Sequence, residues 1–190
     1  MKGRKGEYGY IRRQKRVRLI RALVLYAAAF AVYYIGYRLN HGDRRNIYTV
    51  IAVVGIIPAS MAAVSAIMMW MRKPMDPALF REVSAVSGNL HMLYELFLTT
   101  RDKNLYLDAV LVSQDQVIAY TREESRPAAD IRFFEEHVTK TLRASGYGRK
   151  VKIFTAKKQF LSRVEILNSR GPEEGDTDYL VRSALLAIAL

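Results

Sequence analysis

The 190-residue chain contains 30 Lys and Arg residues against 18 Asp and Glu residues, a formal net charge of +12, and no cysteine. This length allows one domain of ordinary size with a small appendage. The absence of cysteine excludes disulfides, thiolate metal sites and cysteine catalysis. All of the net charge lies in residues 1–73, which hold 14 bases and two acids. Because this excess flanks two long apolar runs, it indicates membrane topology and disfavours a nucleic-acid partner.

Two apolar segments predict transmembrane helices over residues 19–37 and 47–71. The first contains 16 uncharged residues, 22–37, and the preceding Arg21 can reach the lipid head groups on its long side chain. The second contains 25 uncharged residues, more than the roughly 20 that a span needs, and Pro58 near its middle favours a kink. A second span directly after the first argues against a cleaved signal peptide. We therefore expect two retained spans joined by an external loop at residues 38–46.

The distribution of bases around these spans predicts their orientation. Nine bases lie in a basic arm, residues 1–21, three lie in the external loop, and two follow the second span. The positive-inside rule then puts the arm and the residues after the second span in the cytoplasm, which makes this a two-pass protein of the plasma membrane. Anionic lipid is the expected partner of these bases. The bases expected to face lipid are Arg12, Arg13, Lys15, Arg16, Arg18, Arg72 and Lys73.

Small residues recur every four positions in the second span, at Gly55, Ala59 and Ala63. Such a stripe lets another helix approach closely. Its partner is either the side of the first span that carries Ala27 and Ala31, or a second copy of the chain or another subunit of a membrane complex. No acid, base or histidine lies inside the second span, which disfavours a transporter or channel acting alone.

Residues 76–190 predict a small α+β cytoplasmic domain. Asp76 and Pro77 are typical of a helix start, and apolar residues at steps of three and four continue that helix to about residue 100. Later elements are expected as strands over residues 105–112, 117–120 and 151–155 and as helices over residues 130–145, 156–168 and 179–190. The order α-β-β-α-β-α-α predicts a three- or four-stranded mixed sheet, in which residues 117–155 form one crossover between parallel strands.

No motif in the chain carries recognisable chemistry. Phosphate-binding glycine loops, nucleophile elbows and histidine pairs at metal-ligand spacing are all missing from the sequence. We therefore predict no catalytic residue, no cofactor and no metal site, and an enzyme is disfavoured. The remaining enzyme hypothesis is a membrane-tethered enzyme that acts through carboxylates such as Asp108 and Glu95.

One strand resembles part of a known enzyme family. Asp108 lies on a predicted strand that is followed by a strand, a helix and a strand, an order that resembles the core of restriction-endonuclease-like nucleases. In that family an Asp on one strand and a Glu-x-Lys on the next hold a metal and activate water. The next strand here, Val117 to Thr121, contains neither the acid nor the lysine. The resemblance therefore implies at most a degenerate domain of this type.

A local basic stretch stands out in the second half of the chain. Residues 140–163 contain eight bases and no acid. They form a solvated face that pairs with the acidic residues downstream, or they contact anionic lipid, or they bind a partner; nucleic acid is disfavoured because few aromatic residues are interleaved. The candidate partner-binding residues are Arg149, Lys150, Lys152, Lys157 and Lys158. Taken together, these features predict a membrane-anchored binding or scaffolding protein, with an enzyme or an accessory subunit of a larger membrane complex as alternatives.

Overall fold

The computed structural model describes residues 4–88, 90–100, 103–113, 115–170 and 177–189, and the chain divides into two compact units. One unit is a helical hairpin formed by residues 11–74. The other, here called the α+β unit, combines the residues up to Tyr10 with residues 75–190. The chain therefore leaves the α+β unit to form the hairpin and then returns to the same unit.

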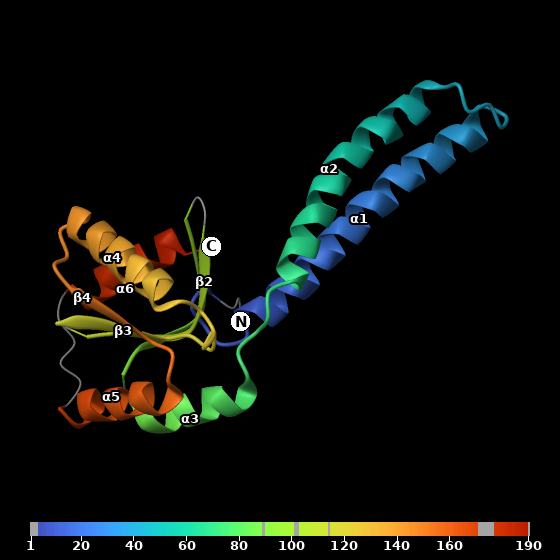
Figure 1. The fold of residues 1–190 in the computed structure, drawn as a ribbon. Helices are drawn as coiled ribbons and strands as arrows, with labels where there is room; N and C mark the ends of the chain where they lie inside the picture. The colour runs from blue at the N-terminus through green and yellow to red at the C-terminus, as the bar shows by residue number, and fades with distance from the viewer. Residues whose placement is uncertain (1–3, 89, 101–102, 114, 171–176, 190) are drawn as a thin grey trace. The chain divides into compact units, whose positions relative to one another are not determined.

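The hairpin consists of α1 (Tyr10–Leu39) and α2 (Ile47–Trp70) (Figure 1). Both helices are long and apolar enough to cross a membrane. α1 has 30 residues because the basic end of the chain is helical from Tyr10 onward, well before the predicted start at residue 19. At the start of α2, the Asn46 side chain accepts a hydrogen bond from the Thr49 backbone N–H at 3.0 Å, which caps the helix. Pro58 is accommodated inside α2.

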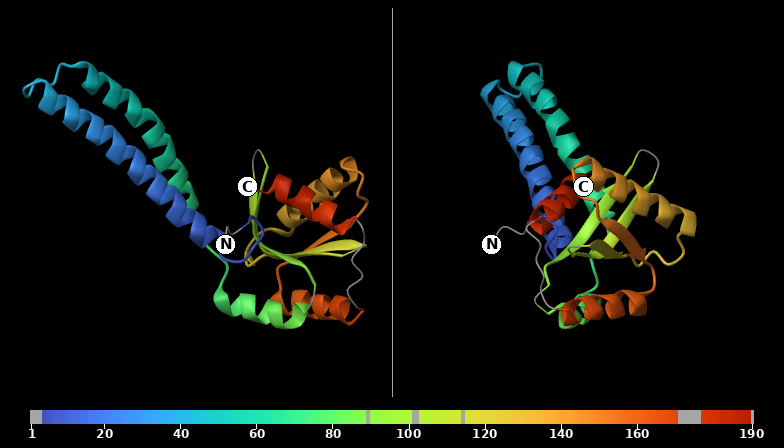
Figure 2. Two further views of the ribbon diagram at one scale, coloured as in Figure 1. Left: turned by 180° about the vertical axis from the view of Figure 1, so that it is seen from behind. Right: turned by 90° about the vertical axis from the view of Figure 1, so that its left-hand side faces the viewer.

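The α+β unit contains one mixed sheet of four strands between two layers of helices (Figures 1 and 2). Its strands lie in the order β1 (Met92–Thr99), β2 (Asn104–Val112), β3 (Gln116–Tyr120) and β4 (Lys150–Phe154). The first three strands are antiparallel, and β4 is parallel to β3. The crossover from β3 to β4 runs through α4 (Ala128–Ala144), which confirms the predicted strand–helix–strand connection.

Each face of the sheet packs against two helices. On one face, Leu107, Val110 and Ala119 pack with residues of α4 and of α6 (Asp178–Ile188). On the other face, Leu111 and Ile118 pack with residues of α3 (Pro77–Ser87) and of α5 (Lys157–Ser169). β2 is buried on both faces from its second residue onward, which explains why its sequence is apolar almost throughout instead of alternating.

The predicted helix over residues 77–100 is wrong in its second half. α3 begins as expected, with the Asp76 carboxylate accepting from the Ala78 N–H at 3.0 Å, but it ends at Ser87, and Gly88 takes a φ of +53° that stops the helix. Residues 92–99 instead pair with β2 as strand β1. The apolar spacing in this segment fits a helix, but pairing with a long apolar strand and burial on both faces override that local pattern. The element order is therefore α-β-β-β-α-β-α-α.

The β1–β2 hairpin reverses its side-chain alternation at one level. The register pairs Tyr94 with Ala109 and Leu96 with Leu107, which places Glu95 opposite Asp108. Before Asp108, the odd-numbered residues Leu105 and Leu107 of β2 pack against α4 and α6. After Asp108, the even-numbered residues Val110 and Val112 do so instead. Glu95 takes a φ of +55°, a conformation that few residues other than glycine adopt. Both strands therefore reverse together, and the pairing continues across the irregular position.

The outer edge of β1 is covered by residues from distant parts of the sequence. The Tyr94 N–H donates to the Gly6 carbonyl oxygen at 2.8 Å, and Ala189 forms an antiparallel bridge with Leu98. The Lys5 ammonium group donates to the Leu186 carbonyl oxygen at 2.7 Å and also to that of Ala189. The first part of the predicted basic arm is thus an integral part of the α+β unit, and it protects a sheet edge that could otherwise pair with another chain.

Tyr8 gives a direct test of this packing. Its ring stacks on Phe80 with centroids 3.9 Å apart, and Phe80 in turn contacts Tyr94 edge-on. We expect Tyr8→Ala to lower the free energy of unfolding of the α+β unit by about 2 kcal/mol, because it removes an aromatic pair and its buried area. Tyr179→Ala is the matched control, since Tyr179 is 69% exposed. Pulse proteolysis in urea measures both variants, and equal stability of the two would show that residues 4–9 do not pack on the unit.

Candidate functional site

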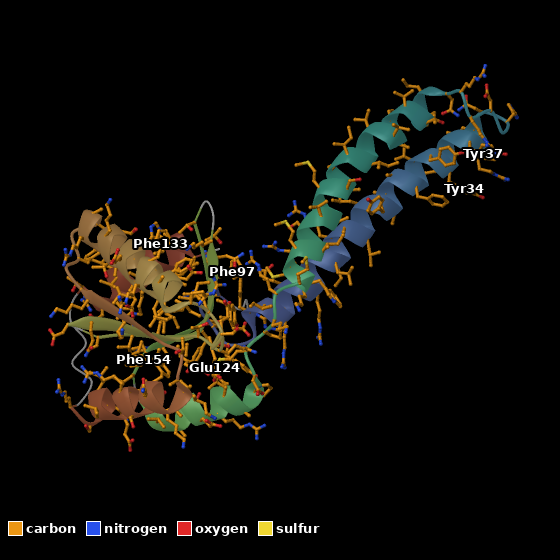
Figure 3. All side chains as sticks on the ribbon, in the orientation of Figure 1. Tyr34, Tyr37, Phe97, Glu124, Phe133 and Phe154 are labelled. Carbon is orange, nitrogen blue, oxygen red and sulfur yellow. The ribbon has the colours of Figure 1, made fainter. Side chains whose placement is uncertain are left out.

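The outer surface of the hairpin is made of large apolar side chains (Figure 3). All but four of the exposed large hydrophobic residues in the described chain lie between Val17 and Met71, and they include Phe30 at 67% and Met61 at 72% exposure. Only 17% of the apolar window in each helix is buried. A core helix of a soluble protein is mostly buried instead, and an apolar surface of this extent marks contact with lipid or with another protein.

The interface between α1 and α2 is made of small residues at intervals of seven. Such spacing keeps a stripe on one side of a helix, and small side chains at these positions let the backbones approach. The buried small residues are Ala22, Ala29 and Gly36 on α1 and Ala52, Ala59 and Ala66 on α2. Two polar contacts add to the packing: Arg18 Nη1 donates to Ser65 Oγ at 3.0 Å, and the hydroxyls of Tyr26 and Ser60 lie 3.2 Å apart.

The predicted stripe Gly55, Ala59 and Ala63 lies mainly on the α1 side of α2. Ala59 is fully buried, and a Cβ atom added to Gly55 would lie 3.7 Å from the Ala29 Cβ atom. Ala63 is half-buried. The predicted partner side on the first span was wrong, because Ala27 and Ala31 are exposed. A second copy of the hairpin would meet the large side chains of the outer surface.

Five of the bases predicted to face lipid lie on the first part of α1, and the other two directly follow α2. Lys15 lies over the ring of Trp70, with its Nζ atom 5.7 Å from the ring centroid, so these two residues link α1 to the end of α2. The exposed members of the set are Arg12, Arg13, Arg16 and Lys73, and the half-buried members are Lys15, Arg18 and Arg72. Their contact with lipid remains a prediction.

The candidate partner-binding stretch separates into one buried arginine and four exposed lysines. Arg149 is 6% exposed and forms an ion pair with Asp178, with 2.5 Å between Nη1 and Oδ1. Its guanidinium also donates to the Ser113 carbonyl oxygen and to Thr177 Oγ1. Arg149 is therefore not at the surface, and its contacts tie the β2–β3 turn to the start of α6. The exposed members are Lys150, Lys152, Lys157 and Lys158.

Two of the exposed lysines pair with acids that the sequence did not suggest. Lys152 lies 3.2 Å from the Glu135 carboxylate on α4, and Lys157 lies 2.7 Å from the Glu82 carboxylate on α3. The Glu82 contact raises the pKa of Lys157. Arg149 does pair with the downstream acid Asp178, but this pair is buried and is not the solvated face that the sequence predicted. Residues 171–176, with Glu173, Glu174 and Asp176, lie outside the described residues.

An open groove of about 660 Å³ lies between α4 and the edge strand β4. Three bases line it, Lys140, Arg143 and Lys150, together with Glu135 and Glu136. Glu135 is already engaged, because its carboxylate accepts a hydrogen bond from the Ile153 N–H of β4 at 2.8 Å as well as contacting Lys152. The groove thus joins a sheet edge to a cluster of bases, a combination that suits an extended acidic segment of a partner.

The two carboxylates of the enzyme hypothesis are buried and occupied. Asp108 is 0% exposed, and it forms an ion pair with the Arg122 guanidinium and accepts a hydrogen bond from the Arg122 N–H at 3.1 Å. Glu95 is 3% exposed and accepts from the Met75 N–H at 2.9 Å, which ties the chain leaving the hairpin to β1. Among the described residues, no group of three or more His, Asp or Glu side chains is placed to hold a metal ion.

Burial sets the electrostatics of this cluster. Burial raises the pKa of Asp108, and the hydrogen bonds and charge of Arg122 oppose that rise. The pKa of Tyr106 is also raised, mainly by burial and further by Asp108. The Tyr106 hydroxyl is buried and makes no hydrogen bond within the described residues, and Arg122 lies over its ring with Cζ 5.4 Å from the centroid. The arrangement ties β2 to the segment after β3, and among the described residues both carboxylates are shielded from solvent.

Sequence reasoning missed Arg122 and the pairing of Arg149 with Asp178. Arg122 follows β3 by two residues and reaches back across the sheet to β2, so only the strand order places it beside Asp108. A weak signal existed in Asp108 itself, a charged residue inside an otherwise apolar strand that requires a partner when both faces are covered.

No protein-family model matches this chain. No curated protein and no solved structure matches it either. The nuclease-like order is present as β2, β3, α4 and β4, but the acid and lysine of the second strand are replaced by buried, uncharged residues. The function must therefore be inferred from the residues of this chain.

The Asp108 pair predicts a pH-dependent difference in stability. Because burial raises its pKa above the ordinary 3.8, the folded chain keeps this proton to a higher pH than the unfolded chain. The contribution of Asp108 to the free energy of unfolding is then largest below pH 3.8, the ordinary pKa. It declines as the pH rises from there through the raised pKa of the folded chain. Asp108→Asn does not titrate and still offers an oxygen to the Arg122 N–H. We expect this variant to gain stability relative to the parent as the pH rises through that range, measured by urea denaturation followed by circular dichroism. A constant difference between the two chains would contradict this account.

Proposed function

We propose that this chain is a two-pass protein of the plasma membrane that holds its α+β unit at the cytoplasmic surface as a binding or scaffolding module. The observation that carries the proposal is the distribution of side chains on the hairpin, with alanine and glycine between the helices and large apolar side chains outside. Lipid is the environment in which such a surface is stable, because its apolar side chains are costly to expose to water.

The membership of the two units supports the proposed topology. Residues before α1 and residues after α2 belong to the same compact unit, which favours a topology with both flanks of the inserted hairpin on one side of the membrane. The excess of bases on these flanks relative to the loop favours the cytoplasmic side. Two independent features, one of the sequence and one of the fold, therefore agree on the same arrangement.

The binding role is supported by the groove between α4 and β4. It is open, and it combines a sheet edge with Lys140, Arg143 and Lys150. These features favour an acidic segment, either of a second copy of the chain or of another subunit of a membrane complex. The enzyme alternative gains no support from the described residues, since Asp108 and Glu95 are both buried and hydrogen-bonded.

Charge substitutions on the hairpin surface test the anchoring. The full chain should stay with the membrane fraction after alkaline carbonate extraction. Val54→Arg/Ile57→Arg places two charges on the exposed apolar surface of α2 and should release the chain, because a charge at the membrane centre costs about 3 kcal/mol per residue. Lys140→Gln/Lys150→Gln is the control and should remain with the membrane. Extraction of the unsubstituted chain by carbonate would overturn the proposal.

A further inference from the structure

A second groove, of about 590 Å³, lies between α1 and α2 where the basic part of α1 gives way to its apolar part. Its polar lining is formed by Gln14, Arg18, Arg21 and Ser65. Apolar residues, among them Leu25, Pro58 and Met61, continue the groove toward the middle of the hairpin. The groove therefore has a charged end and an apolar end, which is the chemical division of a lipid molecule.

Within the part of the chain that the structure describes, the charged end has no acidic partner. Arg18 and Arg21 are one helical turn apart on α1 and line the same groove. Arg18 donates to the neutral Ser65 hydroxyl at 3.0 Å, and within the described residues neither arginine pairs with a carboxylate. The only acid between residues 11 and 74 is Asp43, which lies in the connection between α1 and α2, at the far end of the hairpin. Arg18 is half-buried and Arg21 is exposed, so both guanidinium groups can receive an anion from outside the chain.

The depth of this end matches the phosphate level of a membrane. From Arg21 to Leu39 on α1, and from Ile47 to Ser65 on α2, the helices rise by about 27 Å at 1.5 Å per residue. The hydrocarbon core of a bilayer is about 30 Å thick. When the connection between the helices lies at the outer boundary of the core, Arg18, Arg21 and Ser65 lie at its inner boundary, where the phosphates of the cytoplasmic leaflet are found.

We propose that this groove binds one anionic phospholipid of the cytoplasmic leaflet. The phosphate accepts hydrogen bonds from Arg18 and Arg21, whose planar guanidinium groups suit phosphate oxygens, and one acyl chain lies along Leu25, Pro58 and Met61. The inference rests on the proposed membrane insertion and goes further, because it assigns a lipid class to two named arginines. The apolar end distinguishes this site from a site for free phosphate.

Native mass spectrometry of the full chain tests the proposal. The chain is reconstituted in vesicles of equal parts phosphatidylglycerol and phosphatidylcholine and then released in mild detergent. We expect one phosphatidylglycerol molecule to stay bound in preference to phosphatidylcholine. Arg18→Gln/Arg21→Gln should lower that preference about 30-fold, because two bases near an anionic lipid are lost. Arg12→Gln/Arg16→Gln removes the same charge from exposed positions of α1 outside the groove and should leave the preference unchanged.

The controls separate this inference from the proposed function. Flotation of the vesicles shows whether each variant is inserted, and failure of the unsubstituted chain to float with them would reject both proposals. A chain that inserts but shows no lipid preference, or the same loss in both double variants, would overturn the lipid site alone. Displacement of the lipid by inorganic phosphate would also overturn it, since the site would then recognise phosphate without the acyl chain. Where Arg18→Gln/Arg21→Gln fails to insert, Arg18→Lys/Arg21→Lys replaces it, and an undiminished preference in that variant would contradict recognition by the guanidinium groups.

Discussion

Replacing Arg149 by leucine is expected to lower the free energy of unfolding of the α+β unit by about 4 kcal/mol, because it leaves a buried carboxylate without its partner. Asp178 is 3% exposed, and its Oδ1 atom lies 2.5 Å from Arg149 Nη1. The same guanidinium also binds the Ser113 carbonyl oxygen and the Thr177 hydroxyl. One substitution therefore removes contacts to two separate segments. Pulse proteolysis of the full chain in urea measures the loss.

Two further variants show whether this loss comes from the buried ion pair. Lys150→Leu removes a base from the neighbouring, exposed position and should change the free energy of unfolding by less than about 0.5 kcal/mol. Arg149→Met/Asp178→Leu removes both buried charges and should recover most of the stability, since an apolar pair can replace a buried ion pair at little cost. Equal effects of Arg149→Leu and Lys150→Leu would show that Arg149 is a surface base, as the sequence first suggested.

Gly36→Ala is expected to weaken the packing of the hairpin by about 3 kcal/mol, because overpacking a tight interface displaces its backbone. A Cβ atom at Gly36 would lie 2.2 Å from the Tyr48 Cβ atom, a distance that only a movement of α1 away from α2 can relieve. Titration with sodium dodecyl sulfate, followed by the fluorescence of Trp70, measures the packing. Trp70 is the only tryptophan and contacts Lys15 on the opposite helix, so its signal reports on the hairpin.

Gly55→Ala is the matched control for this substitution. It adds the same methyl group to the same interface, but its Cβ atom would lie 3.7 Å from the Ala29 Cβ atom, an ordinary contact. We expect its midpoint of unfolding to equal that of the parent within error. If Gly36→Ala and Gly55→Ala both unfolded at the same detergent concentration, below that of the parent, the two positions would be equally tight. The packing of α1 against α2 described here would then be contradicted.

The sequence predicted the elements that are marked by long apolar segments, by capping residues or by a regular spacing of apolar residues. The two apolar segments, the Asp76 cap and the order from β2 to α6 are all present close to the predicted positions. The exceptions have physical causes. β1 was predicted as helix because Leu90, Leu93 and Phe97 fit helical spacing, and the reversal at Glu95 removes the alternation by which a strand is recognised.

The candidate sites depend on tertiary contacts that a single sequence does not contain. Arg149 lies in a run of bases, and only the fold separates it from Lys150 by burying it against Asp178. The lipid groove combines Arg21 with Ser65, two positions whose proximity depends on how α1 and α2 are aligned. The spacing of four on α2 included Ala59 but not Ala52, and it gave no guide to Ala22, Ala29 and Gly36 on α1. The buried small residues of both helices recur at seven and not at four.

The arrangement of the hairpin in the membrane is the central claim, and labelling of single cysteines tests it most directly. The chain has no cysteine, so Arg44→Cys in the connection between α1 and α2 and Ser125→Cys in an exposed loop of the α+β unit each give one reactive site. In intact cells, a maleimide that cannot cross membranes should label Arg44→Cys and should label Ser125→Cys only after permeabilisation. Labelling of Ser125→Cys in intact cells, with Arg44→Cys protected, would contradict the account.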